Sequence, residues 1–323
     1  MTARPDLDPE LVALLAALPP APPLGPETLD LIRPYAVGSP VLPDDVDRRD
    51  LTLTVADGTP VGLTVLSPTG GAPGRSRSGA PCIYWVHGGG MVMGDRFSQI
   101  DIPLEWLARF GAVVVTVDYR LAPEVGGATL VEDCYAGLVW TAEHAAELGV
   151  DPHRIVVAGT SAGGGLAAGT VLLARDRRGP AVAGQVLACP MLDHRNDTVS
   201  SRQFDGPAIW SREANAFGWR SVLQGGTEVS PYVSPALADD LSGLPPTYVD
   251  AGSAEVFRDE DVAYAARIWA AGGHAELHVW AGGCHGFDAL FPDARISVAA
   301  REARSRWIER LLVPAVDRSQ GTD

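Results

Sequence analysis

The chain has 323 residues, and 46% of them are hydrophobic, which is enough to bury a sizeable core and excludes an intrinsically disordered protein. The formal net charge of -15 makes nucleic acids and anionic membrane surfaces poor partners, because both repel an acidic protein. All 25 basic residues are arginines, which excludes a Schiff-base lysine, a P-loop lysine and a Ser-Lys catalytic pair.

The first 45 residues predict two short amphipathic helices, Pro9–Leu18 and Glu27–Tyr35, separated by a proline-rich breaker. They are too small to form a domain alone. The apolar run Leu11–Leu18 is too short to span a bilayer, and acidic residues precede it where a signal peptide would be positively charged. We therefore expect a cytoplasmic protein that does not insert into a membrane.

From Arg49 onward the pattern changes to an alternation of apolar and polar residues around the turn pair Asp57-Gly58. This alternation predicts a β-hairpin. The stretch Thr69–Ala80 is rich in glycine, serine, proline and arginine and predicts a surface loop.

The remaining chain alternates short apolar runs with helix-like segments, which predicts a mostly parallel sheet covered by helices on both faces, a doubly wound α/β fold. The runs expected as strands are Cys82–Val86, Ala112–Val117, Ile155–Ala158, Val182–Ala188, Thr247–Val249 and Glu276–Trp280. The expected helices are Thr129–Ala146, Ala162–Arg175, Arg258–Ala271 and Ala294–Leu312. An irregular insert of about residues 195–224 follows one strand end, where it could cover an active site.

The most informative motif is Gly159-Thr160-Ser161-Ala162-Gly163, which lies between a predicted strand and a predicted helix. In a G-x-S-x-G elbow the serine occupies a strained strand-to-helix turn, and the flanking glycines let the chain pass closely around it. Ser161 is therefore predicted to be a catalytic nucleophile, with a histidine as its base.

A second motif, His87-Gly88-Gly89-Gly90, follows the strand Cys82–Val86. Cleavage of an ester by serine needs backbone N–H donors aimed at the developing oxyanion, and glycine allows that close approach. We expect the amides of Gly89, Gly90 and Ala162 to form the oxyanion hole. His87 is expected to be a structural residue that shapes the loop.

These motifs resemble the bacterial hormone-sensitive-lipase-like esterases of the α/β-hydrolase superfamily. The resemblance covers most of residues 80–290 and rests on five segments in the same order: 87–90, 118–124, 159–164, 255–260 and 285–287. It implies a catalytic serine at Ser161, a catalytic histidine at His285 and an acid at Glu255. The usual sequence at the acid is Asp-Pro, whereas this chain has Glu255-Val256, so the identity of the acid stays open.

The chain order serine, acid, histidine is independently the order expected on this fold, and His285 follows the last predicted strand. Asp250, at the end of the strand Thr247–Val249, is the rival acid. Glu255 is favoured because it lies in the loop after that strand, from which a side chain can reach back toward the histidine.

The predicted function is a serine carboxylesterase that uses a Ser-His-acid triad and an acyl-enzyme intermediate, without a cofactor. The resemblance implies esters of short to medium acyl chains, and a helical cap made of residues 1–45 and the insert on a catalytic domain of residues 46–323. Three aromatic residues of the insert are candidates for substrate contact: Trp210, Phe217 and Trp219. A lactone hydrolase or aryl-amide hydrolase is the nearest alternative, and a non-catalytic small-molecule receptor is a more distant one.

No metal site is predicted, because the sequence has no C-x-x-C pair and no H-E-x-x-H motif. The four cysteines are scattered singly and are expected to be reduced core thiols: Cys82, Cys134, Cys189 and Cys284. We expect a small ester as the binding partner and no nucleic acid. The sequence leaves the oligomeric state open, and a homodimer is one alternative.

Overall fold

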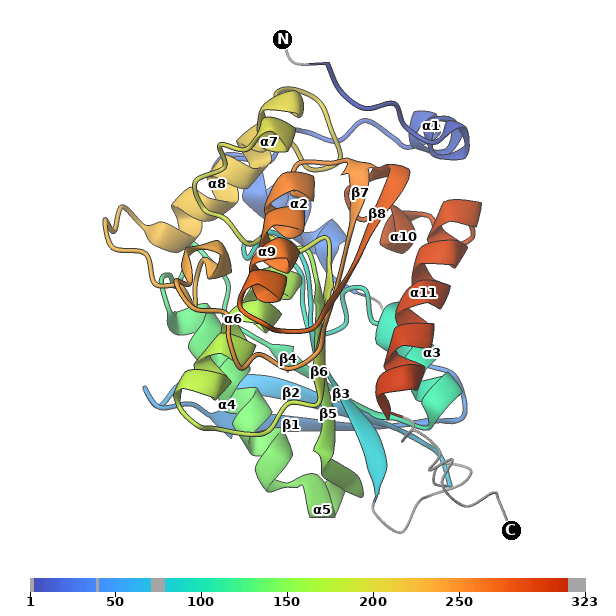
Figure 1. Cartoon of the computed structure of the whole chain (residues 1–323), viewed down its shortest axis with the longest axis vertical. Coiled ribbons are helices and arrows are strands. Elements are labelled where there is room, and N and C mark those ends of the chain that lie inside the picture. Colours follow the sequence, from blue (N-terminus) through green and yellow to red (C-terminus); the bar gives the residue numbers. More distant parts are fainter. Residues whose placement is uncertain (1–2, 39–40, 71–78, 313–323) are drawn as a thin grey trace.

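The computed structural model describes residues 3–38, 41–70 and 79–312. Eight strands form one sheet in the spatial order β1-β2-β4-β3-β5-β6-β7-β8 (Figure 1). β1 pairs antiparallel with β2, β2 pairs antiparallel with β4, and every later pairing is parallel. The strands are β1 (Val46–Thr54), β2 (Pro60–Pro68), β3 (Ala80–Val86), β4 (Val113–Asp118), β5 (Val150–Thr160), β6 (Gly184–Ala188), β7 (Thr247–Ala254) and β8 (Ala275–Cys284).

Helices cover both faces of the sheet, as the apolar strands require. On one face lie α4 (Thr129–Glu143), α6 (Ala162–Asp176) and α9 (Arg258–Ala270), and on the other lie α3 (Asp101–Phe110) and α11 (Arg295–Leu312) (Figure 1). The short helices are α5 (Ala145–Leu148), α7 (Val199–Gln203), α10 (Phe287–Leu290) and the 3₁₀ turn η1 (Pro235–Leu237). The remaining helices are α1 (Pro9–Ala16), α2 (Leu29–Ala36) and α8 (Arg212–Leu223).

The alternation of side chains along β3 explains these two layers. Cys82, Tyr84 and Val86 belong to the apolar cluster under α4, α6 and α9. Ile83 and Trp85 belong to the cluster under α3 and α11. Since successive residues of a strand point to opposite faces, an unbroken apolar run supplies both clusters at once.

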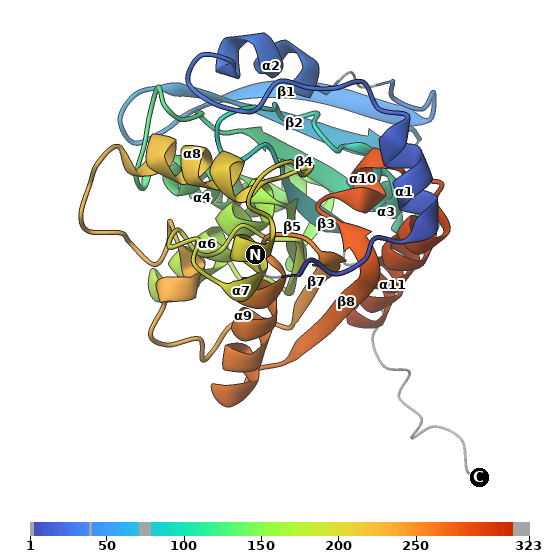
Figure 2. The same cartoon turned by 90° about the horizontal axis from the view of Figure 1, so that it is seen from above.

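The amino-terminal helices and the insert gather at one end of the sheet. α1, α2, α7 and α8 surround the end toward which the parallel strands point their carboxyl termini (Figures 1 and 2). Leu11 of α1 is fully buried against the segment that follows β8, and Leu29 of α2 is buried in the main core. Among the helices of the described residues, none combines the length and apolarity needed to cross a bilayer.

The doubly wound α/β architecture predicted from the sequence is confirmed, including the hairpin, whose Val55 N–H donates to Thr59 O at 3.0 Å. Several boundaries differ: β5 and β8 are longer than predicted, and the segment 129–146 forms two helices. α3 lies outside the predicted helices, and Pro103 near its start is tolerated because the first turn needs no amide donor. Residues 71–78 of the predicted loop lie outside the described residues.

Candidate active site

Ser161 occupies the turn between β5 and α6. Its backbone has φ 56° and ψ -124°, an uncommon conformation for a residue with a side chain. The crossing of strand and helix leaves no room for side chains on either side, because a Cβ at Gly159 would lie 2.3 Å from Gly163 O and one at Gly163 would lie 2.1 Å from Val86 O. The flanking glycines therefore allow the tight packing around the turn in which Ser161 follows the end of β5.

Three side chains from three separate turns form one hydrogen-bonded chain. Ser161 Oγ lies 2.9 Å from His285 Nε2, and His285 Nδ1 lies 2.6 Å from Glu255 Oε2. The other oxygen of Glu255 accepts the Gly252 N–H at 2.7 Å. Glu255 is 1% exposed and His285 is 8% exposed, so the contact between imidazole and carboxylate is screened from water.

Asp250, the rival acid, lies within β7 and has other partners. Its Oδ2 accepts from Arg304 Nε at 2.9 Å and from Trp280 Nε1 at 3.2 Å. Arg304 is buried and reaches Asp288 as well, with 2.6 Å between Nη1 and Oδ2. Asp250 thus belongs to a buried ion cluster, and the structure brings Glu255 to His285.

The glycine loop after β3 runs beside Ser161, since a Cβ at Gly88 would lie 3.4 Å from the Ser161 Cβ. Gly89 has φ 117° and Gly90 has φ 62°, conformations that favour glycine. Within the described part of the chain, the amides of Gly89, Gly90 and Ala162 donate to no other protein group. Three backbone donors are therefore left for a ligand beside the serine hydroxyl.

His87 lies fully buried beneath this loop. Its ring stacks on Tyr119 with 4.2 Å between ring centroids, and the Tyr119 hydroxyl donates to His87 O at 2.9 Å. His87 Nδ1 lies 2.7 Å from Gly88 O. Burial lowers the pKa of His87 to about 4, so the ring is neutral at ordinary pH and packs the loop in place.

The three aromatic residues predicted to contact substrate lie at different places. Trp210 is beside the site: its ring centroid is 6.3 Å from that of His285, and a Cβ at Gly90 would lie 2.3 Å from the indole. Phe217 lies near Pro26 and Leu29 of the amino-terminal segment. Trp219 meets His194 edge to face at 6.2 Å. Only Trp210 is brought next to the catalytic side chains.

The sequence did not predict a role for two residues that support the site. Gln99 Oε1 accepts the Gly88 N–H at 2.9 Å and so holds the start of the glycine loop. Glu260 Oε1 accepts from Leu192 N at 2.8 Å and from Asp193 N at 3.0 Å. Leu192 and Asp193 belong to the segment that follows β6. This segment also contacts the nucleophile turn, because Met191 N donates to Ser161 O at 2.9 Å.

Cys189 forms, with Glu255 and His285, a group whose possible ligand atoms lie within 4.8 Å of one another. The sequence separation of these residues hides this group from motif analysis. Burial raises the pKa of the Cys189 thiol well above its usual range, and a thiol is a much poorer metal ligand than a thiolate. The histidine and glutamate atoms are already hydrogen bonded to each other, so these residues do not fit a metal ion well.

The site can be compared with known proteins. Residues 83–289 match the model of a family described as having the alpha/beta hydrolase fold. The chain belongs to this α/β-hydrolase family. The matched range contains the glycine loop, the nucleophile turn, Glu255 and His285, so the family resemblance drawn from the sequence motifs is confirmed at this level.

Relatives of this α/β hydrolase include esterases. Esterase LipI of Mycobacterium tuberculosis is 31% identical over 316 residues, covering 96% of each chain. Carboxylesterase NlhH of the same species is 35% identical over 241 residues, covering 73% of this chain and 74% of the relative. Among solved structures, a bacterial heroin esterase superposes with a TM-score of 0.86 at 37% identity, covering 95% of this chain and 98% of that chain.

Proposed function

We propose that this α/β hydrolase is a serine carboxylic ester hydrolase, with Ser161, His285 and Glu255 as its catalytic triad. The observation that carries the proposal is the hydrogen-bonded chain from the Ser161 hydroxyl through His285 to the buried Glu255 carboxylate, at a strained turn. The short Nδ1 contact to Glu255 places the ring proton on Nδ1 and leaves Nε2 free to accept the serine proton. The esterase relatives support the same reaction class.

In the first half-reaction, His285 Nε2 takes the proton of Ser161 Oγ as Oγ bonds to the ester carbonyl carbon. The carbonyl π electrons move to the oxygen, and the amides of Gly89, Gly90 and Ala162 donate to this oxyanion. When the intermediate collapses, the C–O bond to the alcohol breaks and the leaving oxygen takes the proton from His285. Glu255 stabilises the imidazolium that exists between these two transfers.

In the second half-reaction, water replaces the alcohol. His285 takes a proton from water, the water oxygen bonds to the acyl carbon, and the bond to Ser161 Oγ breaks as the serine regains a proton from His285. The products are one alcohol and one carboxylic acid per ester. No step of this sequence requires a cofactor.

We further propose that residues 1–45 and the insert at about 195–224 form a cap on a catalytic domain of residues 46–323. The position of α1, α2, α7 and α8 around the carboxyl end of the sheet supports this division (Figure 2). Trp210 supplies an apolar wall to the substrate site, and the expected substrates are esters of short to medium acyl chains. Phe217 and Trp219 belong to the same insert but pack away from the triad, so we propose Trp210 as the aromatic contact with substrate.

The motifs support membership of the hormone-sensitive-lipase-like subgroup of this family. A cytoplasmic location is supported by the four cysteines, which are buried, unpaired thiols suited to a reducing compartment. The oligomeric state to be tested is a homodimer. Nucleic acid is not an expected partner of so acidic a chain.

The experiment that tests the function is a substrate panel with the purified full chain and Ser161→Ala as the control. The panel holds p-nitrophenyl esters from acetate to dodecanoate, an aliphatic lactone and an aryl anilide. We expect hydrolysis of the short and medium esters by the wild type alone. Turnover of the lactone or the anilide with no ester hydrolysis would replace this proposal with the corresponding alternative, and saturable binding without turnover would indicate a receptor.

A further inference from the structure

The glycine loop holds few of its own backbone groups in place. Val92 N and Met93 N both donate to Gly89 O at 3.1 Å, which closes one turn. Met91 within that turn has φ 64°, a conformation that costs energy for a residue with a side chain. Contacts from outside the loop must therefore help to fix the amides of Gly89 and Gly90.

One such contact comes from Arg33 of α2. Arg33 Nε donates to Val92 O at 2.8 Å, and Nη2 donates to Ala122 O at 3.0 Å. Ala122 in turn donates its N–H to Met91 O at 2.9 Å. The guanidinium also binds Glu124 through both terminal nitrogens, at 2.5 Å to Oε1 and 2.7 Å to Oε2. The planar guanidinium makes four hydrogen bonds to these three partners, one more than the three donors of an ammonium group can make.

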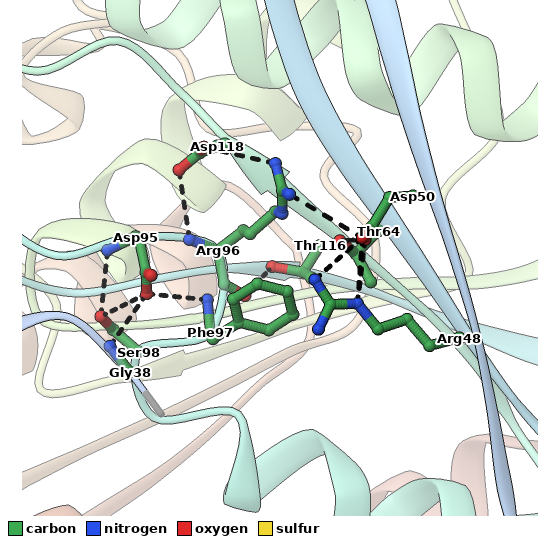
Figure 3. Close-up of polar contacts among 10 residues, drawn as sticks. All are labelled: Gly38, Arg48, Asp50, Thr64, Asp95, Arg96, Phe97, Ser98, Thr116 and Asp118. Atoms are coloured by element: carbon green, nitrogen blue, oxygen red, sulfur yellow. Dashed lines mark hydrogen bonds and ion pairs between the residues drawn. The ribbon is translucent and has the colours of Figure 1, made fainter. Parts of the chain in front are cut away.

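A second contact joins the residues after α2 to the segment that leaves the glycine loop (Figure 3). Asp95 Oδ1 accepts from Gly38 N and from Phe97 N, each at 3.0 Å. Ser98 Oγ donates to Ala36 O at 2.8 Å. The two backbones nearly touch, because a Cβ at Gly38 would lie 2.2 Å from Phe97 O. The amino-terminal segment is therefore bonded to both sides of the loop.

We infer that Arg33 is a positioning residue for the oxyanion hole, acting through Val92 and Ala122 on the amides of Gly89 and Gly90. α2 thereby works as a strap that fixes the glycine loop as well as lying over the site. This inference rests on the proposed esterase function. Since the negative charge on the substrate oxygen develops only in the transition state, misplaced amides should lower kcat and leave KM nearly unchanged.

The chain offers a matched control in Arg175, at the end of α6. Arg175 Nη1 donates to Asp240 O and to Ser242 O, each at 2.9 Å, and its Nε binds Asp176 at 2.7 Å. It thus holds two carbonyls and one carboxylate, as Arg33 does, and the side chains are 22% and 23% exposed. It is fourteen residues along α6 from Ser161, a distance of roughly 20 Å at the helical rise.

The kinetic test compares Arg33→Met, Arg33→Lys and Arg175→Met in the full chain. For p-nitrophenyl acetate we expect Arg33→Met to lower kcat by about 10- to 100-fold with KM changed by less than about threefold. The inhibition constant of a trifluoromethyl ketone, whose adduct places an oxyanion in the hole, should rise by the same factor. Arg33→Lys, which keeps the positive charge, should recover part of kcat, and Arg175→Met should match the wild type.

A second readout does not depend on turnover. Hydrogen exchange measured by mass spectrometry should be faster in peptides covering residues 88–98 of Arg33→Met, and unchanged in those peptides of Arg175→Met. If the wild type hydrolyses no ester, the proposed function fails while the exchange data still test the strap. Unchanged exchange over residues 88–98 in Arg33→Met, or an unchanged kcat in an enzyme that is active, would overturn the inference.

Discussion

Arg304 binds Asp250 deep in the core, with 2.9 Å between Nε and Oδ2, whereas Glu255, five residues after Asp250, binds His285. The two acids that the sequence leaves as rivals therefore have separate partners. This separation makes their roles distinguishable by mutation.

Glu255→Gln should lower kcat by about 10⁴-fold with little change in KM, because the amide keeps the shape but cannot stabilise the imidazolium or enforce its tautomer. Asp250→Asn should lose only a modest factor in kcat. Asp250→Asn should instead lower the free energy of unfolding by on the order of 3 kcal/mol, because the buried Arg304 then loses one of its negatively charged partners. Steady-state kinetics and urea denaturation of both variants check this, and a reversed pattern would make Asp250 the triad acid.

His87 predicts a specific dependence of stability on pH. Burial lowers its pKa to about 4 from an ordinary value of 6.5. The unfolded chain takes up a proton near pH 6.5 while the folded protein does not, so the free energy of unfolding falls as the pH drops from about 6.5 to about 4. The share of His87 between pH 7.5 and pH 5 is about 2 kcal/mol.

Urea denaturation at these two pH values, in the wild type and in His87→Asn, measures that share. The asparagine variant should lose less stability on acidification by about 2 kcal/mol, although it starts from a lower stability at pH 7.5. Equal losses in both proteins would mean that His87 titrates normally in the folded state.

Trp210 should limit the size of the substrate. Trp210→Leu removes apolar bulk beside His285 and Gly90, so the ratio of kcat/KM for p-nitrophenyl octanoate to that for acetate should rise by about tenfold. Trp219→Leu serves as the control, because it makes the same substitution at a residue that packs against His194, and it should leave the ratio unchanged. A larger shift in the Trp219 variant would exchange their roles.

Ester hydrolysis should survive removal of metal ions. The neutral Cys189 thiol and the hydrogen bond between Glu255 and His285 leave that group poorly suited to a metal. Dialysis against a strong chelator should leave kcat unchanged. Loss of activity that added zinc restores would contradict the mechanism.

The fold was predictable where a local pattern determines it. Continuous apolar runs such as Ile155–Ala158 predict strands buried on both faces, and the G-x-S-x-G turn places Ser161 between such a strand and a helix. His285 was predictable from chain order. Glu255 needed the family resemblance, because a carboxylate in a loop has no periodic pattern of its own.

Other features depend on contacts that no local pattern encodes. Gln99 accepts one backbone amide from 11 residues away, Glu260 accepts two from 67 and 68 residues away, and Arg33 lies 59 residues from Val92. The aromatic residues of α8 illustrate a geometric limit. Phe217 and Trp219 are two positions apart, about 200° around a helix, so they cannot both face one site, and Gly218 between them is the residue that approaches Gly90.

The proposed esterase function depends on Ser161 as the nucleophile, and the rate of ester hydrolysis by Ser161→Ala beside the wild type tests this role. We expect the variant to lose on the order of 10⁶-fold in kcat, about as much as His285→Ala or the double variant, because the triad acts as a unit. Its folding should be unchanged, since the Ser161 hydroxyl bonds only to His285 among the described residues. Retention of more than a few per cent of wild-type hydrolysis by a pure Ser161→Ala protein would mean that Ser161 is not the nucleophile.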